Sequence, residues 1–125
     1  MINLRNILLV LTGSALGGTI RFIISVYLQN KIVSKFPLGT FVVNLIGCFL
    51  IGVIFSFVAR NSIGNDDIKL LLATGFCGGF TTFSAFAIEN LDMIRNGNHA
   101  TALTYIILSI ILGIIATLLG TFMFK

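Results

Sequence analysis

The chain has 125 residues, of which 57% are hydrophobic and 10% are charged, whereas globular domains carry about 25% charged residues. A soluble domain of this size needs more polar side chains to cover its surface, so the composition excludes a soluble enzyme domain and a disordered segment. The net charge of +4 comes from basic residues scattered through short connections. They form no basic face that would follow a phosphate backbone. We therefore expect a membrane protein with no nucleic-acid partner.

Long apolar stretches alternate with short polar connections, and each is close to the roughly 20 residues that cross a bilayer as a helix. The expected spans cover approximately residues 4–29, 37–60, 68–94 and 100–124. Because lipid offers no partners to unpaired backbone groups, we expect every span to be helical. The predicted fold class is an all-α membrane protein, with four transmembrane helices in a single domain over residues 1–125.

The basic residues in the connections show almost no bias between the two sides of the membrane. One side would hold Arg5, Arg60, Lys69 and Lys125, and the other Lys31, Lys35 and Arg95. Such bias normally sets the orientation, so its near absence allows both orientations and favours an antiparallel pair of chains. Four helices also make a poor pathway alone, which favours a two-fold dimer. The alternative is that one dominant helix overrides a weak bias.

The third span contains an unusual segment, residues 75–86, with the sequence GFCGGFTTFSAF. Its glycines and two adjacent threonines are poor helix formers. We expect the third helix to be broken in mid-membrane, which is tolerated where the backbone lines a cavity or binds an ion. The alternative is that the glycines only permit close helix packing.

Two phenylalanines of this segment, Phe83 and Phe86, are spaced to share one helical face. Phenylalanine in a membrane helix commonly faces lipid or the protein core. The sharper hypothesis is that the partially positive ring edges meet a small anion. Such contacts are weak enough to permit conduction.

Polar residues also occur in the other spans. Asn44 in the second span has two N–H donors to offer, either to an anion or to a neighbouring helix. Polar and small residues recur every four positions in two other spans, and this spacing predicts a pore wall or a packing seam on each helix. The fourth-span stripe is Thr101, Tyr105, Ser109, Gly113 and Thr117, and the first-span stripe is Gly13, Gly17, Arg21 and Ser25.

Two charged residues lie clearly within spans, Arg21 and Glu89. A charge inside a membrane needs a partner or access to water. For Arg21 we expect a structural or vestibule role. The sequence leaves three roles open for Glu89: a proton carrier, a structural hydrogen-bond acceptor or a residue at the pore mouth. No nucleophile–base pair, phosphate loop or metal-ligand spacing is evident, so the sequence does not predict an enzyme. Cys48 and Cys77 are expected to be small buried side chains.

Three features together are similar to the Fluc (CrcB) fluoride channel family. They are the segment 75–86, the run from Gly39 through Asn44 to Gly52, and the pair Gly17 and Arg21. The resemblance covers essentially the whole chain. Some positions depart from the family's common residues, and these are Gly18, Phe22, Cys48, Ala85 and Gly113.

The resemblance implies a dual-topology, antiparallel homodimer with two fluoride pores. It implies passive export of toxic fluoride across the bacterial cytoplasmic (inner) membrane, by a multi-pass protein that works within the lipid bilayer. The implied fluoride pathway comprises Asn44, Thr82, Phe83, Ser84, Phe86, Tyr105 and Ser109.

The resemblance also implies a structural Na⁺ on the dimer axis. The carbonyl oxygens of Gly78 and Thr81 from both chains would hold it, and oxygen cages of this kind suit a hard cation. Arg21 would raise the local concentration of anions in a vestibule.

Two other function classes share some of these sequence features. A proton-coupled small-molecule exporter similar to the small multidrug resistance proteins also has four spans and dual topology. That class needs a coupling carboxylate in the first span, where this chain has Arg21, while Glu89 lies in the third. A non-transporting membrane assembly protein would show no selective ion flux.

Overall fold

The computed structural model describes residues 2–61 and 65–125, and within these ranges all regular structure is helical. In chain order the elements are α1 (Leu4–Lys31), α2 (Leu38–Arg60), α3 (Asn65–Ile68), η1 (Lys69–Cys77), α4 (Gly78–Phe80), α5 (Phe83–Arg95), α6 (His99–Thr121) and η2 (Phe122–Phe124). Four helical stretches are long and apolar enough to cross a membrane: Leu4–Lys31, Leu38–Arg60, Asp66–Arg95 and His99–Phe124. The prediction of an all-helical protein with four such stretches is confirmed.

Local signals in the sequence account for several helix ends. The side chain of Asn3 caps α1 by accepting the N–H of Asn6 at 2.8 Å, as asparagine commonly does. The hydroxyl of Thr82 caps α5 by accepting the N–H of Ala85 at 3.2 Å. Between α5 and α6 the chain turns through Gly97, whose φ of 77° lies in the region that glycine adopts most easily.

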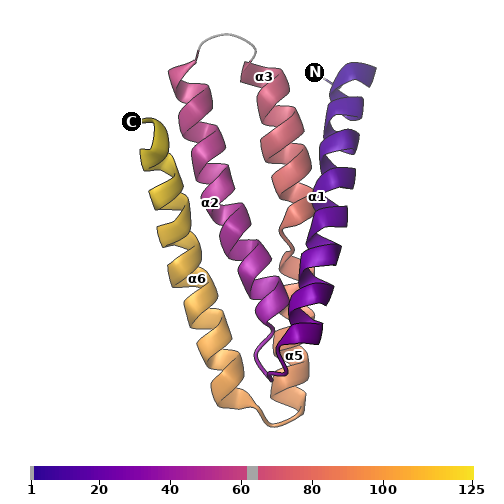
Figure 1. Cartoon of the computed structure of the whole chain (residues 1–125), viewed down its shortest axis with the longest axis vertical. Helices are drawn as coiled ribbons and strands as arrows, with labels where there is room; N and C mark the ends of the chain where they lie inside the picture. The colour runs from indigo at the N-terminus through magenta and orange to yellow at the C-terminus, as the bar shows by residue number, and fades with distance from the viewer. Residues whose placement is uncertain (1, 62–64) are drawn as a thin grey trace.

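The helices pack as two closely associated pairs (Figure 1). α6 runs along α2, and α1 runs along η1 and α4 of the third span. Glycines permit the close approach of α2 and α6, since a Cβ on Gly52 would lie 2.2 Å from the carbonyl oxygen of Thr117. A Cβ on Gly120 would lie 2.2 Å from the carbonyl oxygen of Phe49. Of the fourth-span stripe, Thr117 therefore lies in a packing seam with α2.

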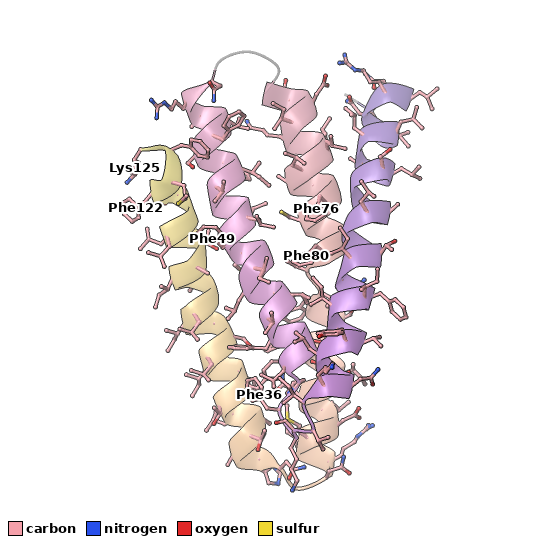
Figure 2. All side chains as sticks on the ribbon, in the orientation of Figure 1. Phe36, Phe49, Phe76, Phe80, Phe122 and Lys125 are labelled. Atoms are coloured by element: carbon pink, nitrogen blue, oxygen red, sulfur yellow. The ribbon has the colours of Figure 1, made fainter. Side chains whose placement is uncertain are left out.

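Glycines bring α1 against the third span in the same way. A Cβ on Gly13 would lie 2.1 Å from the carbonyl oxygen of Leu71, and one on Gly17 would lie 2.1 Å from that of Phe76. Figure 2 labels Phe76 and Phe80 on this third-span segment. The first-span stripe is thus a helix-packing face. Small residues serve the same purpose in many membrane helices.

The interruption of the third span is narrower than the composition of residues 75–86 suggests. The expected break in the third helix is present, but Gly75, Gly78 and Gly79 all lie within helical segments and are not part of it. Close packing against α1 keeps Gly75 and Gly79 helical. Only Thr81 and Thr82 leave the helix, both with extended backbone. Before the break, η1 is a π-helix, a form that occurs often at functional sites.

Aromatic rings join α2, α5 and α6 at the end where the 32–37 connection lies. Met93, Ala102 and Tyr105 form a buried cluster, covered by Phe36, Phe41 and Phe86. The ring of Phe36, labelled in Figure 2, meets Phe41 edge to face at a centroid distance of 5.1 Å, and Tyr105 at 5.2 Å. This packing fixes α5 relative to the other helices after the break.

Candidate functional site

A groove of about 460 Å³ lies between α2, the third span and α6. It brings together seven of the residues that the sequence singled out: Asn44, Gly78, Thr81, Thr82, Phe83, Phe86 and Ser109. Both cysteines also line it as free thiols, with Cys77 buried as expected and Cys48 only half-buried. The interruption of the third span thus opens onto a groove that contains amide, hydroxyl and aromatic groups.

Asn44 holds the interrupted backbone in place. Its Nδ2 donates to the carbonyl oxygen of Thr82 at 3.1 Å, and its Oδ1 accepts the N–H of Thr82 at 2.8 Å. A side-chain amide thereby replaces the helical partners that Thr82 lacks, as buried backbone groups require. Of the two roles left open for Asn44, the structure shows the interhelical hydrogen bond. An amide nitrogen carries two N–H donors, so one remains for the groove.

Side chains of α1 donate hydrogen bonds to backbone carbonyl groups of the third span. Nε of Arg21 donates to the carbonyl oxygen of Gly79 at 2.9 Å, and the hydroxyl of Ser14 donates to that of Gly75 at 3.3 Å. A cation is favourable at a helix C-terminus, where the carbonyl ends of the peptide dipoles point. Arg21 therefore has a structural partner in the broken helix, and its side chain is half-buried.

The two phenylalanines begin α5 directly after the break. Their ring centroids lie 5.6 Å apart with planes tilted by 38°. Phe86 also contacts the buried ring of Tyr105 at 5.0 Å, whereas 79% of Phe83 is exposed in the single chain. The ring of Phe86 is thus held by its contact with Tyr105, whereas the ring of Phe83 is exposed on the surface of the chain.

The carboxylate of Glu89 has two hydroxyl partners. Tyr105 donates to its Oε2 at 2.8 Å, and Thr40 donates to its Oε1 at 2.5 Å. Tyr105 is fully buried and Thr40 is 6% exposed. Sequence reasoning found no partner for Glu89 and did not single out Thr40 as a site residue. The available signal was the position of Thr40 one helical turn before Asn44 on α2, which places both on the same face.

The remaining predicted pathway residues lie at or near the groove. The hydroxyls of Thr82 and Ser84 are 3.1 Å apart and share a hydrogen bond. Ser109 lines the groove from α6, while Ser84 and Tyr105 are absent from its lining. Thr82 and Ser109 thus line the groove, and the hydroxyl of Ser84 reaches it only through its hydrogen bond with Thr82.

The two residues implied as Na⁺ ligands lie close together in the chain and share one groove. Gly78 begins α4 and Thr81 directly follows it, and both line the groove. The N–H of Thr82, which a continuing helix would direct to the carbonyl of Gly78, instead donates to Asn44. Carbonyl oxygens at a helix end suit a hard cation, and two from one chain would need oxygens from elsewhere to complete a coordination shell.

Comparison with known proteins gives a consistent family assignment. Residues 8–121 match the family model described as CrcB-like protein, Camphor Resistance (CrcB). A protein of Azobacteroides pseudotrichonymphae named fluoride-specific ion channel FluC is 44% identical over 117 residues, which cover 94% of each chain. Proteins of the same name from Phocaeicola vulgatus and Gloeothece citriformis are 41% and 43% identical, over 96% and 95% of this chain and 98% and 96% of theirs.

Proposed function

The chain belongs to the CrcB family, and from that premise we propose that it is a fluoride-selective ion channel. It lets fluoride leave the cell passively across the bacterial cytoplasmic (inner) membrane and so reduces fluoride toxicity. The relatives' name, fluoride-specific ion channel, and the four helices able to cross a membrane support this function. A channel changes no covalent bond, so the proposal requires no catalytic residue.

The groove beside the interrupted helix is the observation that carries the proposal. Fluoride is small and strongly hydrated, so a pathway must replace its water with hydrogen-bond donors. Asn44, Thr82 and Ser109 supply such donors along the groove, and the rings of Phe83 and Phe86 border it. Ring edges carry partial positive charge, so they carry the anion between the donors without binding it tightly. Larger, more weakly hydrated anions such as chloride gain less from the donors.

The working unit that we propose is an antiparallel homodimer with two pores. The large exposed ring of Phe83 supports this arrangement, because a second chain would cover it and complete the pathway. Gly78 supports it too, since a Cβ there would meet no atom of the described residues within 4 Å beyond its own helix backbone and chain neighbours. The nearly even distribution of basic residues between the connections allows both orientations.

A structural Na⁺ at the dimer centre belongs to the same proposal. Gly78 and Thr81 of each chain would hold it through their carbonyl oxygens, and the ion would neutralise the oxygen-lined junction between two broken helices. Arg21, whose Nε binds the carbonyl of Gly79, steadies the end of α4 beside that junction. Its positive charge also favours anions near the vestibule.

The contacts of Glu89 weigh against the alternative of a proton-coupled exporter. Two hydroxyl donors, Tyr105 and Thr40, engage its carboxylate, as expected for a structural acceptor. A pH gradient that drives transport, with coupling lost in Glu89→Gln, would favour the exporter instead.

Ion efflux from liposomes tests the proposal. Purified protein is reconstituted into vesicles loaded with fluoride or with chloride, and a channel releases fluoride much faster. Purification and assay with N-methylglucamine in place of Na⁺ tests the central ion. The proposal expects lost efflux and a weakened dimer, while full activity and a stable dimer without Na⁺ would contradict that part.

A further inference from the structure

A second, larger groove of about 870 Å³ lies between the beginning of α1 and the beginning of the third span. It shares no lining residue with the groove beside the interrupted helix. Its lining is mainly apolar, with Ile7, Val10, Leu11 and Leu70 among its residues and Asn6 and Thr74 as uncharged polar ones. Ile7 is 50% exposed and Leu11 is 61% exposed, so an apolar occupant would gain considerable contact there.

Charged groups of both signs lie at the end of this groove where the helices end. Arg5 and Asp67 form an ion pair with each other between α1 and α3. Asp66 and Lys69 line the groove and are exposed. Within the described residues 2–61 and 65–125, neither of them forms an ion pair. The groove therefore offers one carboxylate and one ammonium group to an occupant.

The order of the charged and apolar side chains along the groove also indicates what kind of ligand would fit it. Asp66 lies in the first turn of the third span, and Lys69 follows three residues later, about 4.5 Å further along a helix. Apolar Leu70 and the small side chain of Thr74 come next. From the helix end inward, the groove thus presents a negative group, a positive group and then an apolar channel.

We propose that this groove binds one phospholipid with an ethanolamine head group. Such a lipid has the complementary order: an ammonium outermost, a phosphate two carbons further in, and then acyl chains. Asp66 binds the ammonium, Lys69 binds the phosphate, and one acyl chain lies against Ile7, Leu11 and Leu70. Lysine near a membrane surface attracts lipid phosphate, and its stem is long enough to reach the head-group level. The site depends on membrane insertion and not on fluoride conduction.

Charge complementarity distinguishes this occupant from two others. An anionic lipid without a cation, such as phosphatidylglycerol, would satisfy Lys69 and leave Asp66 facing a phosphate. A second copy of the chain would have to place a complementary ion pair at this end. The zwitterionic head group satisfies both charges at once.

Native mass spectrometry of the intact protein tests the proposal. The protein is reconstituted with equal amounts of phosphatidylethanolamine and phosphatidylglycerol, extracted in mild detergent, and scored for lipid retained per chain. We expect retained phosphatidylethanolamine to exceed phosphatidylglycerol about fivefold. Asp66→Asn should abolish this preference, and Lys69→Gln should lower retention of both lipids about fivefold. Asp92→Asn and Lys31→Gln remove the same charges elsewhere on the exposed surface and should change neither value.

Three outcomes would overturn the proposal. Equal retention of both lipids by the wild-type chain is one, and unchanged retention in both groove variants is another. The third is intermolecular cross-linking through a cysteine placed at Leu11, because a second copy would then occupy the groove. Size-exclusion profiles and fluoride efflux of the four variants should match wild type, so a lipid effect is separable from misfolding and from loss of conduction.

Discussion

Asn44 and Thr82 exchange two hydrogen bonds across the interruption of the third span, one at 3.1 Å and one at 2.8 Å. A single side chain on α2 thereby fixes the backbone from which α5 and its phenylalanines begin. The sequence left Asn44 open between a donor to an anion and a hydrogen bond to a neighbouring helix, and in the structure its amide supports the geometry of the site.

Replacing Asn44 with alanine should therefore destabilise the protein. The change leaves the N–H and carbonyl of Thr82 without partners, at about 1–3 kcal/mol for each buried group. Because Asn44 is half-buried and water compensates in part, we expect a loss of about 2 kcal/mol and a fall in fluoride efflux of at least about tenfold. Thermal unfolding in detergent and liposome efflux measure the two effects.

Asn61→Ala is the matched control for this change. Asn61 is exposed, and its amide donates only to the carbonyl of Phe57 in the last turn of α2. Its replacement should leave both measurements near wild type. An Asn44→Ala protein with wild-type melting would show that the break does not depend on this side chain.

A second prediction concerns two adjacent glycines of α1. A Cβ at position 17 would lie 2.1 Å from the carbonyl oxygen of Phe76, whereas one at position 18 would meet its nearest atom, the carbonyl oxygen of Gly79, at 3.8 Å. Gly17→Ala must separate α1 from the third span and should destabilise by about 1–3 kcal/mol or more. Gly18→Ala should fold normally and gain some helix stability. Equal yields and melting temperatures for both variants would contradict the close packing of these helices.

The hydrogen bond from Tyr105 to Glu89 gives a third prediction. Tyr105→Phe removes a donor to a charged group and should lower stability by about 1.5–3 kcal/mol. Tyr27→Phe, at an exposed tyrosine on α1, should have little effect. In a Glu89→Gln background the effect of Tyr105→Phe should shrink, because paired groups are not additive. Full additivity in thermal unfolding would show that the two side chains do not interact.

The sequence predicted the helices better than it predicted the contacts between them. Long apolar stretches are sufficient for four membrane-crossing helices, but helix propensity overestimated the interruption near Gly75 and Gly79. Propensity describes an isolated helix, and packing against α1 overrides it. Tyr105 and Thr40, which bind the carboxylate of Glu89, lie on two other helices. No local sequence pattern indicates which helices pack together.

For the candidate site, too, the sequence predicted the residues better than their contacts. The resemblance named Asn44, Thr82 and Ser109, and the structure places them along one groove. Their roles in conduction remain predictions. The bond from Arg21 to the carbonyl of Gly79 was not predictable, because it depends on where the helix ends and not on residue type. The 79% exposure of Phe83 in the single chain was not predictable either, because it depends on how α5 begins after the break.

Phe83 allows function to be separated from folding. Because 79% of the residue is exposed in one chain, Phe83→Ile should change the folding stability within a single chain by no more than about 0.5 kcal/mol, and any larger loss would come from the proposed dimer contact. It removes the ring edge beside the groove, so fluoride efflux should fall at least about tenfold. Phe122→Ile, at an exposed ring near the C-terminus, should conduct like wild type. Undiminished efflux by Phe83→Ile would exclude the aromatic contact from the pathway.

The most direct test of the central claim is the ratio of fluoride to chloride efflux from liposomes that contain the purified wild-type protein. The proposed channel should release trapped fluoride within seconds to minutes and leave chloride trapped, with no requirement for a pH gradient. Equal release of both anions, or fluoride release only when a proton gradient is imposed, would contradict a passive fluoride-selective channel.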